Sequence, residues 1–225
     1  MRLNKYLALQ LGISRREADI IIESSTVSIN GAPAEIGNKV NEGDQVAVAG
    51  TDVAQAVTEH QYILLNKPTG FVCSRKSQGT NKTIYELLPP ELHRLKPVGR
   101  LDKDSSGLIL LTNDGDFALR MTHPRFAKVK VYNVRLNHDL EPLHQQMIAD
   151  IGVQLEDGRS QLSLSRMSDE SRKEWVVTMA EGRNRQIRRT FDSLGYNVKK
   201  LHRIQFGNYS LGDMKRGEFK TVNIQ

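Results

Sequence analysis

The sequence predicts an α+β protein of two domains, and three features indicate it. Segments with helical spacing and segments with strand-like alternation follow one another without a regular order, which is typical of the α+β class. Residues 1–60 carry 5 Lys/Arg and 8 Asp/Glu, a net charge of −3, whereas residues 61–225 carry 27 and 18, a net charge of +9. Residues 50–60 contain no bulky apolar side chain other than two valines. We therefore expect a domain at 1–50, a linker at 51–60 and a larger domain at 61–225.

The expected first domain consists of two short helices followed by small strands. Apolar residues recur at helical spacing over 3–11, and Ser14 with Glu17 forms a capping box that predicts the start of a second helix. Alternating residues predict strands at 27–29 and 46–48, the first followed by an Asn-Gly hairpin turn.

The opening stretch is basic although the domain as a whole is acidic, since no acid precedes Glu17. Cations on exposed helices often have no partner, so these side chains form either a solvated face or a surface that binds an anion. The basic residues concerned are Arg2, Lys5, Arg15 and Arg16.

The larger domain is expected to begin with a buried strand at 62–65 and a turn that contains Lys67. A polar segment at 74–82 has no apolar residue to bury and predicts a mobile surface loop. The further expected strands lie at 108–111, 129–136, 153–155, 162–164, 175–179, 197–202 and 206–211, and the expected helices at 117–121, at 142–152 with Asp139 as cap, and from Asn184 to Gly195.

Asp102 is the leading candidate for a reactive group. It lies in a stretch bounded by Gly99 and Gly107, directly ahead of a strongly apolar run, so its neighbours hold it near the surface. An Asp in such a turn is more often a turn-former that bonds its own backbone. A calcium loop is excluded, because its twelfth position would be Asn113, where a bidentate Glu is needed.

Four ordered segments raise Asp102 above the turn-former interpretation, and they are 65–70, 96–108, 130–134 and 181–189. Together they resemble the pseudouridine synthases that modify ribosomal RNA, in the branch typified by the small-subunit enzyme. The first domain resembles the S4 RNA-binding domain at the front of that branch, so the resemblance covers nearly the whole chain.

The resemblance implies a mixed, mainly antiparallel sheet flanked by helices, and it implies roles for individual residues. Asp102 is then the catalytic carboxylate, Arg188 pairs with it, Tyr132 stacks on the target base, and Leu201 lines the pocket. A cation beside a carboxylate favours its charged form. The expected RNA contacts are Arg2, Lys5, Arg15, Arg16, Lys67, Arg100, Arg183, Arg185 and Arg189.

The implied reaction is isomerisation of a uridine to pseudouridine, which gains and loses no atoms and needs no cofactor. The sequence agrees, because it has no His-x-x-x-His pair, a single cysteine (Cys73) and no Gly-Lys-Ser/Thr phosphate loop, so we expect no metal and no cofactor. Whether Asp102 attacks the sugar, attacks the ring or removes a sugar proton stays open.

The expected partner is ribosomal RNA or a ribosome assembly intermediate, and a net charge of +6 suits that polyanion. No run of residues is apolar enough for a membrane helix or a signal peptide, so we expect a cytoplasmic protein, acting as a monomer. The main alternative is a catalytically silent RNA-binding or ribosome-assembly factor. A glycosidase that uses Asp102 and Asp104 fits the cationic surroundings less well.

Overall fold

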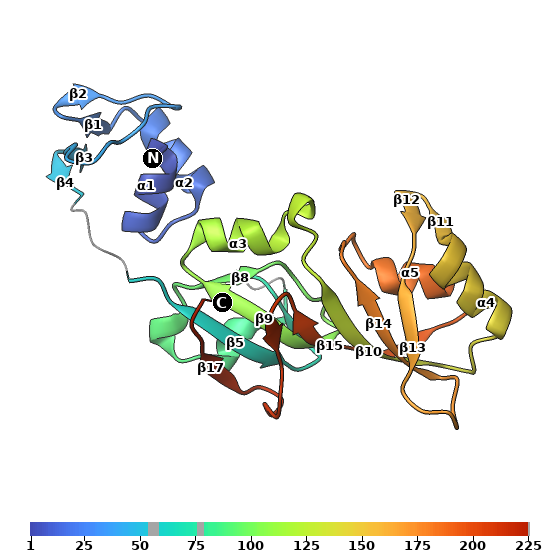
Figure 1. Ribbon diagram of the computed structural model, residues 1–225. Helices are drawn as coiled ribbons and strands as arrows, with labels where there is room; N and C mark the ends of the chain where they lie inside the picture. Colours follow the sequence, from blue (N-terminus) through green and yellow to red (C-terminus); the bar gives the residue numbers. More distant parts are fainter. Residues whose placement is uncertain (54–58, 76–78, 225) are drawn as a thin grey trace. The chain divides into compact units, whose positions relative to one another are not determined.

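The computed structural model describes residues 1–53, 59–75 and 79–224, and it divides into two compact units, Met1–His60 and Gln61–Gln225 (Figure 1). Residues 54–58 of the expected linker and 76–78 of the expected mobile loop lie outside the described residues. Part of the expected linker is regular structure, because Thr51–Asp52 forms a strand that pairs with the preceding one.

The first unit has the expected order of helices and strands. Ser14 caps the second helix: its hydroxyl accepts a hydrogen bond from the backbone N–H of Glu17 (3.1 Å), and the Glu17 carboxylate accepts one from the N–H of Ser14 (2.7 Å). The sheet order is β2-β1-β3-β4, and both helices bury apolar side chains against it. The elements are α1 (Leu3–Gln10), α2 (Arg15–Glu23), β1 (Val27–Ile29), β2 (Ala32–Pro33), β3 (Val46–Val48) and β4 (Thr51–Asp52).

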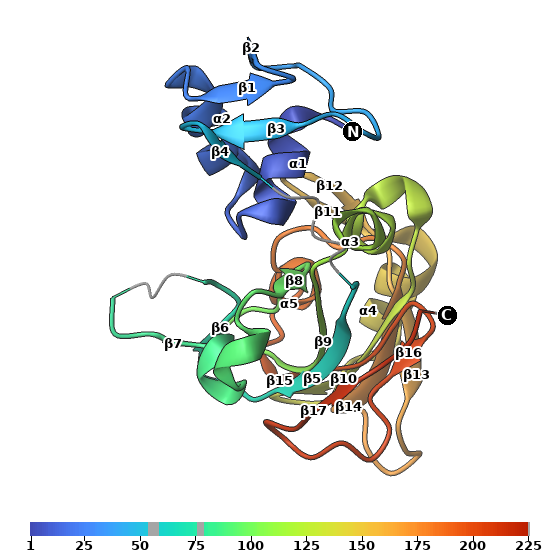
Figure 2. The same ribbon diagram turned by 90° about the vertical axis from the view of Figure 1, so that its left-hand side faces the viewer.

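The second unit is built on a nine-stranded sheet with the order β13-β14-β10-β15-β9-β5-β17, to which β16 adds beside β15 and β8 beside β9 (Figure 2). Every pair in this sheet is antiparallel except β9 with β15, so the expected mixed, mainly antiparallel sheet is confirmed. The strands are β5 (Tyr62–Lys67), β8 (Lys96–Val98), β9 (Ser106–Thr112), β10 (Lys130–Leu136), β13 (Ser163–Arg166), β14 (Glu174–Met179), β15 (Val198–Phe206), β16 (Tyr209–Ser210) and β17 (Phe219–Thr221).

Helices flank this sheet, with α3 beside the half that contains β9 and β5, and with α4 and α5 beside the half that contains β13 and β14 (Figure 1). They are α3 (Gly115–Thr122), α4 (Pro142–Gln146), which continues as one π-helical stretch (Met147–Ile151), and α5 (Gln186–Asp192). Short 3-10 turns lie at Ile84–Leu87, Pro90–Leu92 and Pro124–Phe126, and two-strand ribbons join β6 (Phe71–Val72) to β7 (Lys82–Thr83) and β11 (Val153–Leu155) to β12 (Gly158–Ser160).

Two predicted helix caps are wrong. The residue that precedes α5 as N-cap is Arg185, in the left-handed region with φ 46°, and Asn184 lies one residue earlier. The residue that precedes α4 as N-cap is Glu141, whose side chain makes no cap hydrogen bond, and Pro142 follows it at the start of the helix, where proline is favoured. Asp139 therefore has no capping role.

The two halves of the sheet meet where β9 runs parallel to β15, over the pairs Ser106 with His202 and Gly107 with Arg203. The backbones come very close there: a Cβ placed on Gly107 would lie 2.2 Å from the Arg203 carbonyl oxygen, and Gly107 has φ +106°. Only glycine fits this conformation and this contact. The catalytic candidate Asp102 lies in the loop that leads into this junction.

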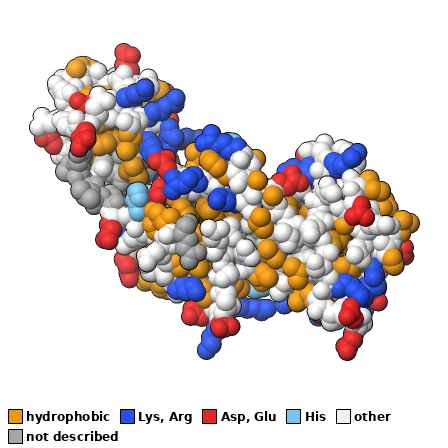
Figure 3. All heavy atoms as spheres, in the orientation of Figure 1, with side chains coloured by type: hydrophobic (Ala, Val, Ile, Leu, Met, Phe, Trp, Pro, Cys, Tyr) orange, Lys and Arg blue, Asp and Glu red, His pale blue; other side chains and the backbone are white. Residues whose placement is uncertain are grey.

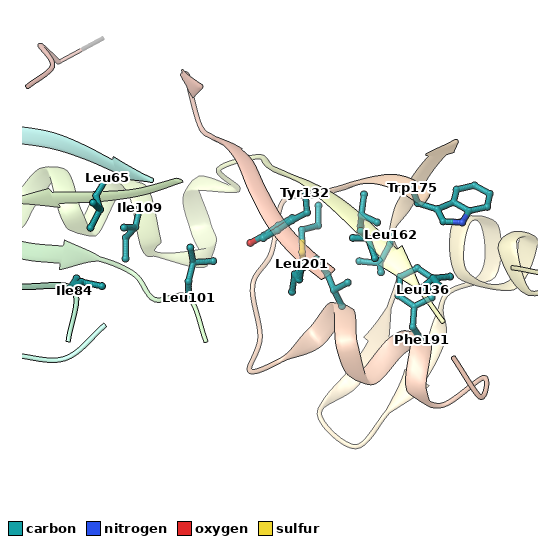
Figure 4. Packing of buried hydrophobic residues seen from close by; sticks show 14 of the residues in the cluster. Leu65, Ile84, Leu101, Ile109, Tyr132, Leu136, Leu162, Trp175, Phe191 and Leu201 are labelled. Atoms are coloured by element: carbon teal, nitrogen blue, oxygen red, sulfur yellow. The ribbon is translucent and has the colours of Figure 1, made fainter. Parts of the chain in front are cut away.

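The sheet separates two apolar clusters. The larger one follows the β10–β14–β15 half and includes Trp175 and Phe191, both fully buried (Figure 4). The same cluster contains Tyr132 and Leu201, which lie close together on neighbouring strands (Figure 4). The residues expected to form the pocket therefore extend the core toward the β9–β15 junction.

Candidate active site

The loop that carries Asp102 joins β8 to β9 and is held in place by hydrogen bonds. The Ser105 N–H donates to the Asp102 carbonyl (3.1 Å), which closes a turn, and the fully buried Lys67 ammonium donates to the carbonyls of Ser105 (2.7 Å) and Pro68 (2.9 Å). Burial lowers the pKa of Lys67, against the opposing charges of Cys73 and two nearby carboxylates. The prediction that Lys67 contacts RNA is wrong, because no part of its side chain reaches the surface.

The Asp102 side chain is 33% exposed, and its carboxylate faces an arginine other than the expected one. Arg185 Nη1 lies 3.4 Å from Asp102 Oδ2, and the same guanidinium forks onto Asp104, with Nη1–Oδ1 at 3.2 Å and Nη2–Oδ2 at 3.3 Å. The left-handed backbone at Arg185 projects this side chain from the start of α5 toward the loop. Arg185 was expected to contact RNA, and its pairing with Asp102 was missed.

The predicted ion pair between Arg188 and Asp102 is wrong. Arg188 Nη2 pairs with Asp104 Oδ2 (3.2 Å) and donates to the Asp104 carbonyl (3.0 Å), while Nη1 donates to the Val198 carbonyl (2.8 Å). Its side chain is 12% exposed, so burial lowers the pKa of Arg188, while the charge of Asp104 opposes this. Arg188 therefore holds the loop at Asp104, two residues beyond the reactive candidate.

The second carboxylate of the loop, Asp104, is kept charged by these arginines. Burial alone would raise the pKa of Asp104, but the hydrogen bond from Arg185 and the charges of Arg188 and Arg185 outweigh it, so that the pKa lies below its usual value. Because Asp104 binds both guanidiniums, the Asp102 carboxylate keeps one contact, at 3.4 Å, among the residues that the structure describes. Asp102 is thus the less strongly bonded of the two carboxylates, although the Asp104 side chain is the more exposed (50% against 33%).

A cavity of about 320 Å³ opens beside Asp102. Its volume is in the range that suits a small organic ligand or one nucleotide base. Tyr132, Ile187 and Leu201 supply an apolar wall. Tyr132 lies opposite a bulge in β15: Val131 pairs with Gln205 and Tyr132 with Arg203, which leaves Ile204 as the extra residue. A bulge bends and twists the strand that contains it. The expected pocket role of Leu201 agrees with this placement, and Tyr132 and Leu201 lie together in Figure 4.

Two of the arginines expected to bind RNA are instead tied to the β11–β12 ribbon. Arg183 donates to the carbonyls of Asp157, Gly158 and Arg159 and pairs with the Asp157 carboxylate (2.9 Å). Arg189 pairs with the other oxygen of that carboxylate (2.6 Å). The guanidiniums of Arg183 and Arg189 therefore anchor the ribbon to the start of α5, and the contact of either side chain with RNA stays a prediction.

The remaining expected RNA contacts lie on surfaces. Arg100 is exposed at the rim of the cavity. In the first unit, Arg2, Arg15 and Arg16 are exposed and Lys5 is half-buried, and Figure 3 shows basic side chains gathered on the side that carries the two helices. Their contact with RNA stays a prediction.

The sequence analysis missed three cations that line the cavity, Lys128, Lys130 and Arg203. Arg203 is 3% exposed, and its Nε donates to the Leu108 carbonyl across the β9–β15 junction (2.7 Å). Alternation along β15 could have identified it, because Arg203 lies on the same face as Leu201.

Within residues 1–53, 59–75 and 79–224, the structure contains no cluster of His, Cys, Asp or Glu that could hold a metal ion. In the same part of the chain, no helix is long and apolar enough to cross a bilayer. Cys73, to which no chemistry was assigned, is half-buried against the backbone of Leu101.

Comparison with known proteins assigns both units. The family model described as RNA pseudouridylate synthase matches residues 61–193, and the S4 domain model matches residues 1–46. The chain belongs to the RNA pseudouridylate synthase family. A crystal structure of a pseudouridylate synthase superposes with a TM-score of 0.71 at 31% identity, covering 99% of this chain and 96% of that one.

Several curated members of this family resemble the chain along almost its whole length. Ribosomal large subunit pseudouridine synthase B of Bacillus subtilis is 33% identical over 98% of this chain and 91% of its own. Ribosomal small subunit pseudouridine synthase A of Vibrio parahaemolyticus is 36% identical over 99% and 96%. The dual-specificity RNA pseudouridine synthase RluF of Escherichia coli is 36% identical over 99% and 75%. Relatives of both subunit specificities therefore match about equally well.

Proposed function

We propose that this protein converts a specific uridine of ribosomal RNA to pseudouridine, with Asp102 as the catalytic carboxylate. The observation that carries the proposal is the position of Asp102 at the opening of a cavity walled by Tyr132 and Leu201, where it is one-third exposed and lightly bonded. The relatives named for ribosomal RNA substrates support the choice of RNA.

The reaction breaks the bond between N1 of uracil and C1′ of ribose and forms a bond between C5 and C1′. The proton lost from C5 is replaced by one on N1, so the product has the same atoms as the substrate. Asp102 supplies the negative charge beside the sugar or ring, and the guanidinium of Arg185, 3.4 Å away, helps to orient the carboxylate.

The target nucleotide has to leave its helix or loop to reach Asp102. Unstacking a base costs a few kcal/mol, which stacking on an aromatic side chain offsets. Tyr132 supplies that ring, and Leu201 packs beside it. The close contact of Gly107 with the Arg203 backbone joins the strand that follows the Asp102 loop to β15, the strand that carries Leu201.

The S4 domain supplies the larger part of RNA selection in this proposal. Its exposed cations, with Arg100 at the cavity rim, contact phosphates and so select an RNA by the shape of its backbone, not by its base sequence. We also propose that the protein acts as a cytoplasmic monomer on ribosomal RNA or an assembly intermediate. Size-exclusion chromatography with light scattering of the free protein and of its RNA complex tests the monomer, and a mass of two chains contradicts it.

The test of function compares the wild-type protein with Asp102→Asn, which keeps the size of the side chain and removes its charge. Purified small-subunit and large-subunit rRNA are incubated with each protein, and pseudouridine is quantified by mass spectrometry of nucleosides. We expect product with the wild type, none above background with Asp102→Asn, and unchanged product with Asp213→Asn, an exposed aspartate outside the cavity.

RNA affinity is measured on the same three proteins. Equal affinity with lost product places Asp102 in the chemistry. Tight binding without product from the wild-type protein, on rRNA known to be unmodified, would instead identify a silent RNA-binding factor and refute the proposal.

A further inference from the structure

Two cations lie inside the cavity without a carboxylate to balance them. Arg203 and Lys130 both line it, and among the residues that the structure describes neither has an acidic oxygen within 4.0 Å. Glu181, an acid on the cavity wall, is engaged elsewhere, since its carboxylate binds Arg183 and Gln186. Unbalanced buried charge is costly, so this arrangement calls for an anion.

The geometry of Arg203 strengthens this conclusion. Its guanidinium carbon lies 4.7 Å from the centre of the Phe206 ring, and its Nε is satisfied by the Leu108 carbonyl. Nη2, however, is buried and has no hydrogen-bond partner among the described residues. A buried donor without an acceptor is uncommon in folded proteins and costs roughly 1–3 kcal/mol.

The neighbouring Lys130 is affected by the charge of Arg203. Lys130 Nζ lies 5.5 Å from the centre of the same Phe206 ring and is bonded to the carbonyls of Lys128 (3.0 Å), Glu181 (3.3 Å) and Ala180 (3.4 Å). Burial lowers the pKa of Lys130, and the charge of Arg203 lowers it further, while Glu181 only partly opposes this. Lys128, also on the cavity wall, adds a third cation.

We propose that Arg203, Lys130 and Lys128 form a binding site for a phosphate group of the RNA strand that carries the target uridine. A neutral acceptor such as a uracil carbonyl would satisfy the free Nη2 donor and leave the charges unbalanced, whereas a phosphate does both. Since the same cavity holds Asp102 and Tyr132, the phosphate enters with the flipped nucleotide. This inference rests on the proposed function.

The experiment measures how RNA affinity depends on salt, because each lost phosphate contact lowers the slope of log K against log[salt] by about 0.7 for single-stranded RNA. The proteins are full-length chains in an Asp102→Asn background, so that no turnover occurs, and the probe is purified rRNA. We expect Arg203→Gln to lower the slope by about 0.7 and the affinity by about tenfold or more at low salt. Lys128→Gln is expected to lower the slope in the same direction, whereas Lys220→Gln, an exposed lysine of β17 outside the cavity, leaves it unchanged.

A fall in affinity with an unchanged slope would overturn the inference, since Arg203 would then contact the uracil or only support the sheet. An equal change of slope in Lys220→Gln would overturn it as well, because the effect would be one of overall charge. Thermal melts check that each variant is folded. If Arg203→Gln does not fold, Arg203→Lys and Lys128→Gln decide the question. If neither of these variants changes the slope or the affinity, the proposed site is refuted. The outcome is separate from that of the proposed function, which is judged by the isomerisation assay on wild-type protein.

Discussion

Replacing Gly107 by alanine tests how the two halves of the sheet are joined. The added Cβ would lie 2.2 Å from the carbonyl oxygen, 2.6 Å from the nitrogen and 2.9 Å from the carbonyl carbon of Arg203. These are backbone atoms, so the contact is relieved only if β9 and β15 separate. The positive φ adds to the cost, because +106° is a conformation that residues with a Cβ rarely adopt.

The expected destabilisation follows from these two effects. A left-handed backbone costs roughly 1–2 kcal/mol for a residue with a Cβ. Forcing an extra methyl group into a packed interior costs roughly 1–3 kcal/mol. The sum of roughly 2–5 kcal/mol is a large part of the stability of an ordinary domain, and it corresponds to a midpoint lower by about 10 °C for a chain of this size.

The assay is thermal unfolding followed by the fluorescence of Trp175. This is the only tryptophan of the chain, it is fully buried in the second unit, and it therefore reports on that unit alone. Gly115→Ala is the matched control, because a Cβ at Gly115 meets nothing within 4 Å and the residue starts α3. We expect the control to leave the midpoint unchanged or slightly higher. A Gly107→Ala midpoint within about 2 °C of the wild type would refute the reasoning, given the roughly 2–4 °C per kcal/mol expected at this size.

Three further predictions concern charged and ionisable groups. Lys67→Met leaves the carbonyls of Ser105 and Pro68 without a donor. We expect the free energy of unfolding, measured by chemical denaturation, to fall by about 2–4 kcal/mol, and kcat to fall by a larger factor than KM changes. An unchanged kcat would contradict the role given to Lys67. Because the pKa of Asp104 is lowered in the folded protein, its contribution to stability is present above its unfolded pKa of about 4 and is lost as pH falls through the folded value. The stability difference between wild type and Asp104→Asn, about 1 kcal/mol or less near neutral pH, should therefore shrink between pH 6 and pH 3, and a difference independent of pH would be inconsistent with the ion pairs. Burial raises the pKa of Tyr62 and of Tyr85 to about 12, so a titration followed by tyrosinate absorbance should show tyrosines that ionise above the usual pH of about 10. Tyr85→Phe should remove one of them. The stability that both groups supply below pH 10 should decline as the pH rises toward 12.

Local sequence predicted the parts of the fold that depend on neighbours in the chain. The capping box of Ser14 with Glu17 and the apolar run after Gly107 are local patterns, and both form as expected. The placement of Asp102 at a cavity mouth followed from motifs that resemble a known family, since the spacing alone favoured an ordinary turn.

Contacts between residues far apart in the sequence could not be predicted from local patterns. Arg185 and Asp102 are 83 residues apart, and which of four nearby arginines faces the carboxylate depends on the left-handed backbone before α5. The turn that contains Lys67 predicts a lysine at the surface, but the loop of Ser105 packs over this side chain and buries it. Such side chains are placed by tertiary contacts that no local pattern encodes.

The measurement that tests the central claim most directly is a map of pseudouridine in ribosomal RNA from three strains of the source organism. One strain lacks this protein, one has the wild-type gene restored, and one has the Asp102→Asn gene restored at equal protein level. The account predicts that at least one rRNA position loses its modification in the deletion strain and regains it only with the wild-type gene. Restoration by Asp102→Asn, or identical maps in all three strains, would contradict it.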